Sequence, residues 1–159
     1  MDLLSNYWIL LSKLLIFGLI GYFIMIFVIY LLTPTKKWDE FPKKCNIRTN
    51  CTRVADSNNR GHGLRPIVLE NNLENVQSKI IQIINAKPRM KIINEKRGFI
   101  HAIDITLFFR FYDDIAIKIF KKGKKTEIWL QSQSRLGYYD LLVNENRIQK
   151  LHSEISKLE

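Results

Sequence analysis

The sequence predicts an α+β protein, in which an N-terminal transmembrane helix precedes a small domain of antiparallel sheet covered by two helices. Two patterns predict this class. An uncharged apolar run comes first, and two stretches of helical periodicity then enclose three or four stretches that alternate as strands do. The length of 159 residues leaves room for one domain and an appendage, which excludes a multidomain enzyme. Hydrophobic residues make up 47% of the chain, which excludes intrinsic disorder.

The first element is the run Leu14–Leu32, which contains no charged residue. Roughly 20 apolar residues cross a hydrocarbon core of about 30 Å, and Trp8, Tyr30 and Trp38 lie where interfacial aromatic residues occur. A buried helix is the alternative, but the length favours a membrane span. Because residues 33–36 lack the small-residue pattern of a signal cleavage site, we predict an uncleaved single-pass anchor over residues 1–33.

Two arguments about the orientation of this anchor disagree. The positive-inside rule places the domain in the cytoplasm, because the C-terminal flank carries Lys36, Lys37, Lys43, Lys44 and Arg48. Cys45 and Cys51 favour the opposite side, because two cysteines in a loop-like stretch suit a disulfide in an oxidising compartment. Free thiols are the alternative, and a zinc site with His62 is disfavoured by the Cys-x5-Cys spacing. We expect the domain on the non-cytoplasmic side.

Residues 34–68 are rich in Lys, Asn, Arg, Pro and Gly and have no apolar periodicity, so we expect a linker and an irregular lead-in that contains the cysteine pair. The α+β domain is expected over residues 69–159. Its first helix should run from Glu70 to just before Pro88, because apolar residues recur at intervals of three and four. The expected stripe consists of Leu73, Val76, Ile80 and Ile83 or Ile84.

Three or four antiparallel strands should follow this helix. The first two are expected at residues 90–95 and 99–111, with Gly98 as the turn between them, and one face of the second should carry Phe99, Ile103, Ile105, Leu107 and Phe109. The alternation at residues 115–120 and 127–132 predicts a hairpin with a lysine-rich tip at residues 121–125. A final helix should begin at about Leu141, with Asp140 as its cap. Its apolar stripe is Ile148, Leu151, Ile155 and Leu158.

A polar motif occupies residues 132–148, and its members are Ser132, Ser134, Arg135, Gly137, Asp140, Asn144, Arg147 and Ile148. Their spacing resembles the Ser-x-Ser-Arg-x-Gly-x-x-Asp-x-x-x-Asn-x-x-Arg-Ile signature of the family catalogued as domain of unknown function 1499. Three further segments resemble family motifs in the same order: residues 45–51, residues 62–66 and the pair 99–102 with 111–114. The resemblance covers about residues 45–152. Two positions depart from it, since Tyr139 stands where the family often has Ser and Leu142 where it often has Gly.

The resemblance implies a membrane-associated or envelope domain whose activity is unassigned. Its shared polar residues form our candidate cluster: His62, His101, Asp113, Asp114, Ser132, Ser134, Arg135, Asp140, Asn144 and Arg147. Arg135 lies in a loop before a helix N-terminus, so with the two serines it could hold a phosphate or a carboxylate. The alternative, which we favour, is an ion pair between Arg135 and Asp113 or Asp114 that fixes the loop.

These residues favour a non-catalytic binding or accessory module at the cell envelope. A hydrolase that uses His101 as base and Ser132 or Ser134 as nucleophile is the alternative, but no nucleophile elbow, metal cluster or cofactor loop accompanies them, and we expect no cofactor. The formal charge of +10 and the lysine-rich tip fit a lipid membrane, and an anionic or lipid-like ligand is the expected partner. Nucleic acid is not expected, because no aromatic platform accompanies the scattered basic residues. The sequence leaves the oligomeric state open.

Overall fold

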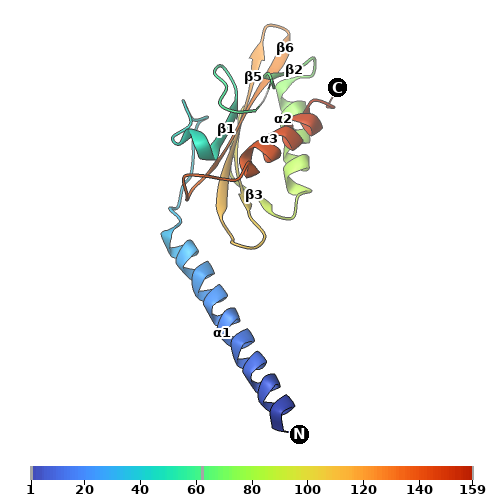
Figure 1. The fold of residues 1–159 in the computed structure, drawn as a ribbon. Coiled ribbons are helices and arrows are strands. Elements are labelled where there is room, and N and C mark those ends of the chain that lie inside the picture. Colours follow the sequence, from blue (N-terminus) through green and yellow to red (C-terminus); the bar gives the residue numbers. More distant parts are fainter. Residues whose placement is uncertain (1, 62, 159) are drawn as a thin grey trace.

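The computed structural model of the chain describes residues 2–61 and 63–158. Helix α1, Asp2–Leu32, projects from one end of the remaining domain (Figure 1). Within the described part of the chain, one helix is long and apolar enough to span a membrane, and it is the stretch Asn6–Leu32 of α1. This stretch contains the uncharged run that the sequence analysis singled out. Its side chains are mostly exposed, as expected of a helix whose apolar surface requires a lipid environment.

The domain is α+β, and its sheet has six antiparallel strands rather than the three or four expected. The strand order is β1-β6-β5-β4-β3, and β2 also pairs with β6. The two unexpected strands are β1, Cys51–Val54, and β2, Ile67–Leu69, which both lie in the segment expected to be irregular. Periodicity did not find them because β1 is buried on both faces and β2 has only three residues. A short 3-10 helix, Arg48–Asn50, leads into β1.

The other four strands form a meander: β3, Met90–Lys96; β4, Phe99–Ile105; β5, Tyr112–Lys122; and β6, Lys125–Ser134. Gly98 makes the predicted turn with a φ of 76°, and a Cβ at this position would lie 2.7 Å from the carbonyl oxygen of Ile119. Only glycine fits so close to a neighbouring strand. The tip between β5 and β6 is the predicted lysine-rich turn.

Strand β4 ends six residues earlier than expected, at Ile105, so Leu107 and Phe109 lie in a loop and not on the sheet. Thr106 closes this loop. Its amide donates to the carbonyl oxygen of Phe111 at 2.9 Å, and its hydroxyl accepts from the amide of Phe111 at 2.9 Å. These two hydrogen bonds join the ends of β4 and β5 and leave the residues between them outside the ladder.

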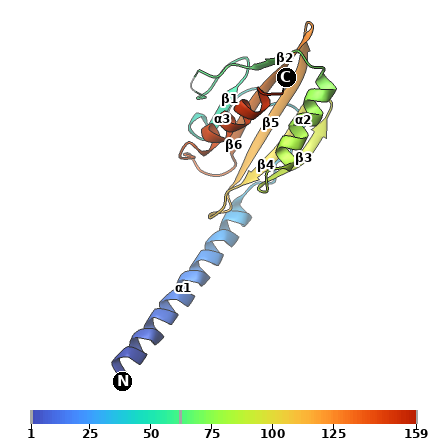
Figure 2. The same cartoon turned by 90° about the vertical axis from the view of Figure 1, so that its right-hand side faces the viewer.

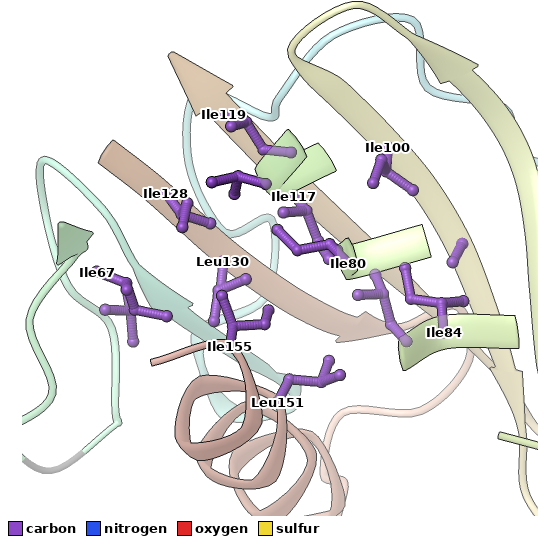
Figure 3. Packing of buried hydrophobic residues seen from close by; sticks show 14 of the residues in the cluster. Ile67, Ile80, Ile84, Ile100, Ile117, Ile119, Ile128, Leu130, Leu151 and Ile155 are labelled. Atoms are coloured by element: carbon purple, nitrogen blue, oxygen red, sulfur yellow. The ribbon is translucent and has the colours of Figure 1, made fainter. Parts of the chain in front are cut away.

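Two helices cover one face of the sheet, as predicted (Figure 2). Helix α2, Leu73–Asn85, begins at Asn72, whose side chain accepts from the amide of Asn75, and it buries the predicted stripe through Ile84. Helix α3 is Val143–Ile155. Between the helices and the sheet lies a core that consists largely of isoleucine, in which Ile80 lies beside Ile117 and Ile155 beside Leu130 (Figure 3). β-branched side chains suit both the strands and this packing.

Helix α3 begins two residues later than predicted, and its formal cap is Leu142 rather than Asp140. Leu141 and Leu142 have φ values of 48° and 64°, so the chain enters the helix through two left-handed residues. Asp140 still satisfies the helix start, because its Oδ2 accepts from the amide of Asn144 at 3.0 Å. The left-handed conformation gives a physical reason for the glycine that the family often has at position 142.

Residues 34–50 cover the other face of the sheet. The backbone amide of Trp38 donates to His101, and the carbonyl oxygen of Pro42 accepts from Arg53 at 2.6 Å. Phe41 packs against Trp129 with 5.8 Å between the ring centroids. The segment expected to be a linker therefore forms part of the domain, and we call residues 34–50 the covering segment.

Candidate functional site

The residues of the polar motif lie on both faces of the sheet. Successive side chains of a strand point to opposite faces of the sheet, so the side chains of Asp113 and Asp114 on β5 lie on different faces. The register places Asp113 opposite Ser134 and Asp104, and Asp114 opposite Gln133 and Ile103. The candidate cluster thus divides into two buried centres, one under the helices and one under the covering segment.

Arg147 of α3 organises the centre on the helix-covered face, which we call the Arg147 centre. Its Nε donates to Asp104 Oδ2 at 2.9 Å, and one terminal nitrogen donates to Asp113 Oδ2 at 2.7 Å. The other terminal nitrogen donates to Ser132 Oγ at 3.0 Å and to Asn144 Oδ1 at 2.7 Å. The guanidinium therefore joins α3 to β4, β5 and β6, and the Arg147 side chain is only 5% exposed.

Asn144 and the two serines complete this centre. Ser132 Oγ donates to Asn144 Oδ1 at 2.6 Å, and Asn144 Nδ2 donates to Ser134 Oγ at 2.9 Å and to the carbonyl oxygen of Asn50 at 3.0 Å. Each hydroxyl is thus held by the network and does not face a substrate. A serine used in this way is structural, because a nucleophile needs a base within hydrogen-bond reach.

The electrostatics of the Arg147 centre are governed by burial. Burial raises the pKa of Asp113, the positive charge of Arg147 opposes this effect, and the neighbouring carboxylate of Asp104 adds to it. Burial of the carboxyl group is therefore the main reason that the pKa of Asp113 is raised, although Arg147 lies beside it.

The second centre, on the opposite face, consists of His101, Asp114 and Arg135, and we call it the Arg135 centre. Arg135 grips Asp114 with two nitrogens, at 2.8 Å and 3.1 Å from Oδ1, and His101 Nε2 lies 2.8 Å from the same oxygen. Of the two aspartates considered for Arg135, Asp114 is its partner. The His101 and Asp114 side chains are completely buried, and that of Arg135 is 7% exposed.

The covering segment closes the Arg135 centre. Arg135 also donates to the carbonyl oxygens of Pro34 at 3.2 Å and Lys36 at 3.1 Å, so it ties the residues directly after α1 to the sheet. The amide of Trp38 donates to His101 Nδ1 at 3.1 Å, and the indole stacks on the imidazole with 4.9 Å between centroids. A donor on Nδ1 assigns the proton to Nε2, which then donates to Asp114.

This geometry separates the residues of the hydrolase alternative. Both ring nitrogens of His101 are occupied by partners inside the protein, which leaves no lone pair to activate a nucleophile. Ser132 and Ser134 lie on the other face of the sheet, because they are opposite Ile115 and Asp113 while His101 is opposite Ala116. The proposed base and nucleophile therefore cannot meet.

Of the remaining candidates, Asp140 borders the Arg147 centre through the amide of Asn144. Asp140 pairs with Arg60 at 2.8 Å, and although burial alone would raise its pKa, the hydrogen bonds from Arg60 and from the amide of Asn144 lower it overall. His62 lies outside the described residues. Cys45 and Cys51 form a disulfide with a Cα–Cα distance of 5.9 Å, which closes the covering segment onto the start of β1.

A cavity of about 440 Å³ borders the Arg147 centre between the end of α2 and the start of α3. It is lined by Lys87, Pro88, Arg89, Met90, Asp104, Val143, Asn146, Arg147, Lys150 and Leu151. Four of these residues are basic and one is acidic. The acidic one, Asp104, is 1% exposed and its Oδ1 has no hydrogen-bond partner in the described structure. A buried acceptor without a donor is costly, so this atom indicates where a ligand donor would fit.

Sequence reasoning missed Asp104 and the residues that cover the Arg135 centre. One signal for Asp104 was available, because it is an acidic residue on the face of β4 that also presents Ile100 and Ala102. No local pattern identifies Trp38, which reaches His101 across 63 residues of sequence.

Comparison with known proteins agrees with the motifs quoted above. The family model described as "Protein of unknown function (DUF1499)" matches residues 43–155, which is more than half of the chain. No curated protein matches the sequence.

Proposed function

This chain belongs to the DUF1499 family, whose function is unknown, and from that premise we propose that it is a membrane-anchored binding or accessory module of the cell envelope rather than an enzyme. The observation that carries the proposal is the unpartnered Oδ1 of Asp104 in a cavity lined by basic side chains. The internal pairing of His101, Ser132 and Ser134 supports it, because the groups that catalysis would use are already occupied.

The lining defines the chemistry of the ligand. Arg89 lies 3.5 Å from Asp104 Oδ2, but its side chain is about half exposed, and Lys150 is exposed, so both can reach an anion at the mouth of the cavity. Arg147, by contrast, is committed to the buried network. Asp104, which lines the same cavity, has a carboxylate oxygen, Oδ1, that is left without a hydrogen-bond donor. A ligand with an anionic group for the basic side chains and a hydroxyl or amine donor for Asp104 Oδ1 satisfies both parts of the cavity. We therefore propose a phosphate ester that carries a free hydroxyl, either as a soluble compound or as a lipid headgroup.

The anchor and the disulfide support a placement at the envelope. Helix α1 has the length and composition of a membrane span, and the Cys45–Cys51 disulfide suits an oxidising compartment. We propose that α1 anchors the protein in the membrane and that the domain lies on the non-cytoplasmic side, against the positive-inside rule.

Calorimetric titration tests the cavity. The full chain, held in nanodiscs of phosphatidylcholine, is titrated with glycerol 3-phosphate, with inorganic phosphate and with glycerol. We expect glycerol 3-phosphate to bind about tenfold more tightly than phosphate, because one additional hydrogen bond to a carboxylate contributes about 1.5 kcal/mol. Arg89→Ala and Lys150→Ala should weaken the binding of glycerol 3-phosphate and of inorganic phosphate. Lys124→Ala at the hairpin tip is the matched control, and it should change neither affinity.

A second arm separates the two sources of the ligand. Nanodiscs that contain phosphatidylglycerol should lower the apparent affinity for glycerol 3-phosphate if the cavity accepts a lipid headgroup, and should leave it unchanged if the ligand is soluble. Equal binding of glycerol 3-phosphate by wild type and Lys150→Ala, or no binding by either, contradicts the proposed site.

Thiol accessibility tests the orientation. In intact cells, Cys45 and Cys51 should react with a maleimide that does not cross membranes only after a reductant has been added. Labelling of both cysteines without reductant by a maleimide that crosses membranes, together with no labelling by the impermeant reagent, would place the domain in the cytoplasm and would contradict this part of the proposal.

A further inference from the structure

Large apolar side chains that are exposed outside α1 gather in two loops. With the exception of Val68, those among the described residues lie between β4 and β5 or between β6 and the first turn of α3. They include Leu107, Phe108, Phe109, Tyr138, Tyr139 and Leu141, which are 51–84% exposed. Apolar groups concentrated at one place on a protein surface mark an interaction site.

Both loops lie at the same end of the sheet, and α1 arrives at that end. Asp113 is opposite Ser134, so the loop that enters β5 and the loop that leaves β6 are neighbours. Arg135, which follows β6, hydrogen-bonds to Pro34 just after α1. Figures 1 and 2 show α1 meeting the domain at the end where the β4–β5 loop turns.

The β4–β5 loop also contacts α1 directly. The hydroxyl of Tyr22 donates to the carbonyl oxygen of Phe108 at 2.7 Å. Tyr22, Met25, Ile26 and Ile29 are half-buried while their helix neighbours are exposed, so one face of α1 turns toward the domain. Ten residues separate Tyr22 from Leu32, which corresponds to about 15 Å of helix. The loop therefore extends along the anchor and not away from it.

The lengths are consistent with a loop that enters the lipid. The apolar stretch Asn6–Leu32 has 27 residues, whereas roughly 20 residues cross a hydrocarbon core. The last turns of α1 can therefore lie in the headgroup region together with the loop, because Lys13, seven residues after Asn6, is close enough to the opposite interface for its ammonium group to reach the headgroups there. Lipid does not satisfy backbone polar groups, but the hydrogen bond from Tyr22 satisfies the carbonyl oxygen of Phe108, and Thr106 satisfies both backbone groups of Phe111.

The charges at this end suit an anionic surface. Arg110 is exposed within the β4–β5 loop, and Arg89 lies beside its base, because its carbonyl oxygen accepts from the amide of Ile105 at 3.2 Å. Aromatic residues next to basic ones are typical of protein segments at the membrane interface.

We infer that the β4–β5 and β6–α3 loops form a second membrane contact, which seats the domain on the bilayer with its apolar tips in the interface. The occupant of this surface is the lipid bilayer that holds α1. The inference rests on the proposed anchor and adds a surface that fixes the domain against the membrane. The cavity at Asp104 then opens near the headgroups, because Met90 and Asp104 are paired at the same end of the sheet.

Fluorescence quenching by brominated lipid tests this surface. The full chain is reconstituted into vesicles of phosphatidylcholine and phosphatidylglycerol with and without bromine on the acyl chains. Phe108→Trp and Tyr139→Trp add a reporter to each loop, and both positions are exposed, so the fold tolerates the change. Lys124→Trp, at the tip between β5 and β6, is the matched control at the opposite end of the sheet.

We expect brominated lipid to quench at least half of the fluorescence added by Phe108→Trp and by Tyr139→Trp, and little of that added by Lys124→Trp. Equal quenching of loop and control reporters would overturn the inference. It would also be overturned if the loop reporters are not quenched and crosslinking shows that a second copy of the chain covers them instead of lipid. Trp8 reports the anchor independently, as the difference in quenching between wild type and Trp8→Phe, because Trp38 and Trp129 are common to both. Quenched Trp8 with unquenched loops would therefore reject the seating surface alone, whereas unquenched Trp8 would reject the anchor.

Discussion

Asp113 and Asp114 are adjacent in the sequence, yet they belong to two buried centres with different roles. Asp113 faces the helices and pairs with Arg147, whereas Asp114 faces the covering segment and pairs with Arg135. The Arg147 centre joins α3 to three strands and borders a cavity, so it serves the fold of the domain and the proposed site. The Arg135 centre holds the residues directly after α1, so it fixes the domain to the end of this helix.

This comparison teaches that one type of ion pair performs two tasks because a strand presents alternate residues to opposite faces. It also shows where binding is possible. The Arg135 centre is closed by Trp38, while the Arg147 centre retains an unpartnered carboxylate oxygen beside open space.

Loss of Arg147 should have the largest effect. Arg147→Ala leaves Asp104 and Asp113 buried without their main cation, and breaking a buried pair in this way costs about 3–5 kcal/mol. Urea unfolding of the full chain in detergent micelles measures this loss. Lys150→Ala, an exposed change on the same helix, should alter the free energy of unfolding by less than about 0.5 kcal/mol. If both variants unfold alike, the Arg147 centre does not stabilise the fold.

Loss of Arg135 should cost less, about 1.5–3 kcal/mol, because Asp114 keeps its hydrogen bond to His101. Double-mutant cycles sharpen the comparison of the two centres. Arg135→Ala should couple to Asp114→Asn and not to Asp113→Asn, while Arg147→Ala should show the reverse. Coupling of Arg135 to neither aspartate would mean that the ion pair is not what fixes this loop, and would make Arg135 a candidate ligand group.

The pH dependence of stability should differ between Asp113 and Asp140. Burial raises the pKa of Asp113, so the stability that this residue contributes is full below its ordinary pKa of about 3.9 and is lost as pH rises through the raised value. Asp140 has a lowered pKa, so its contribution is present above pH 3.9 and is lost as pH falls.

Unfolding of wild type, Asp113→Asn and Asp140→Asn between about pH 3 and pH 8 measures both contributions. The stability of wild type relative to Asp113→Asn should fall as pH rises, whereas that relative to Asp140→Asn should rise. Equal slopes for the two variants would contradict the assignment of opposite pKa shifts.

The smallest effect concerns Leu142, in the loop that runs from Arg135 to the start of α3. Leu142 has a φ of 64°, and L-residues other than Asn and Asp enter this region at a cost of about 1 kcal/mol. Leu142→Gly should therefore raise the midpoint of thermal unfolding slightly, while Gln149→Gly, at an exposed position in the interior of α3, should lower it. A lower midpoint for Leu142→Gly would show that contacts of the leucine side chain outweigh the backbone strain.

The sequence by itself determined the apolar anchor, the α+β class, both helices, the hairpin and the family. These features arise from local patterns: an apolar run of membrane length, residues recurring at three and four, and alternation in β5 and β6. The polar motif also indicated that Arg135 requires a partner, and Asp113 and Asp114 were the available carboxylates. Periodicity could not show β1, which is buried on both faces, or the end of β4, where Leu107 and Phe109 continue the alternation into a loop.

Only the tertiary structure decided how the candidate residues group. The register of β4, β5 and β6 assigns Asp113 and the serines to one face and His101 and Asp114 to the other, and a shift of one residue would have exchanged them. The closing contacts of His101 come from Trp38, which is distant in the sequence. Strand register and long-range docking depend on the packing of the whole sheet, which no local pattern encodes. The sequence therefore supplied the members of the two centres, and the fold decided which of them meet.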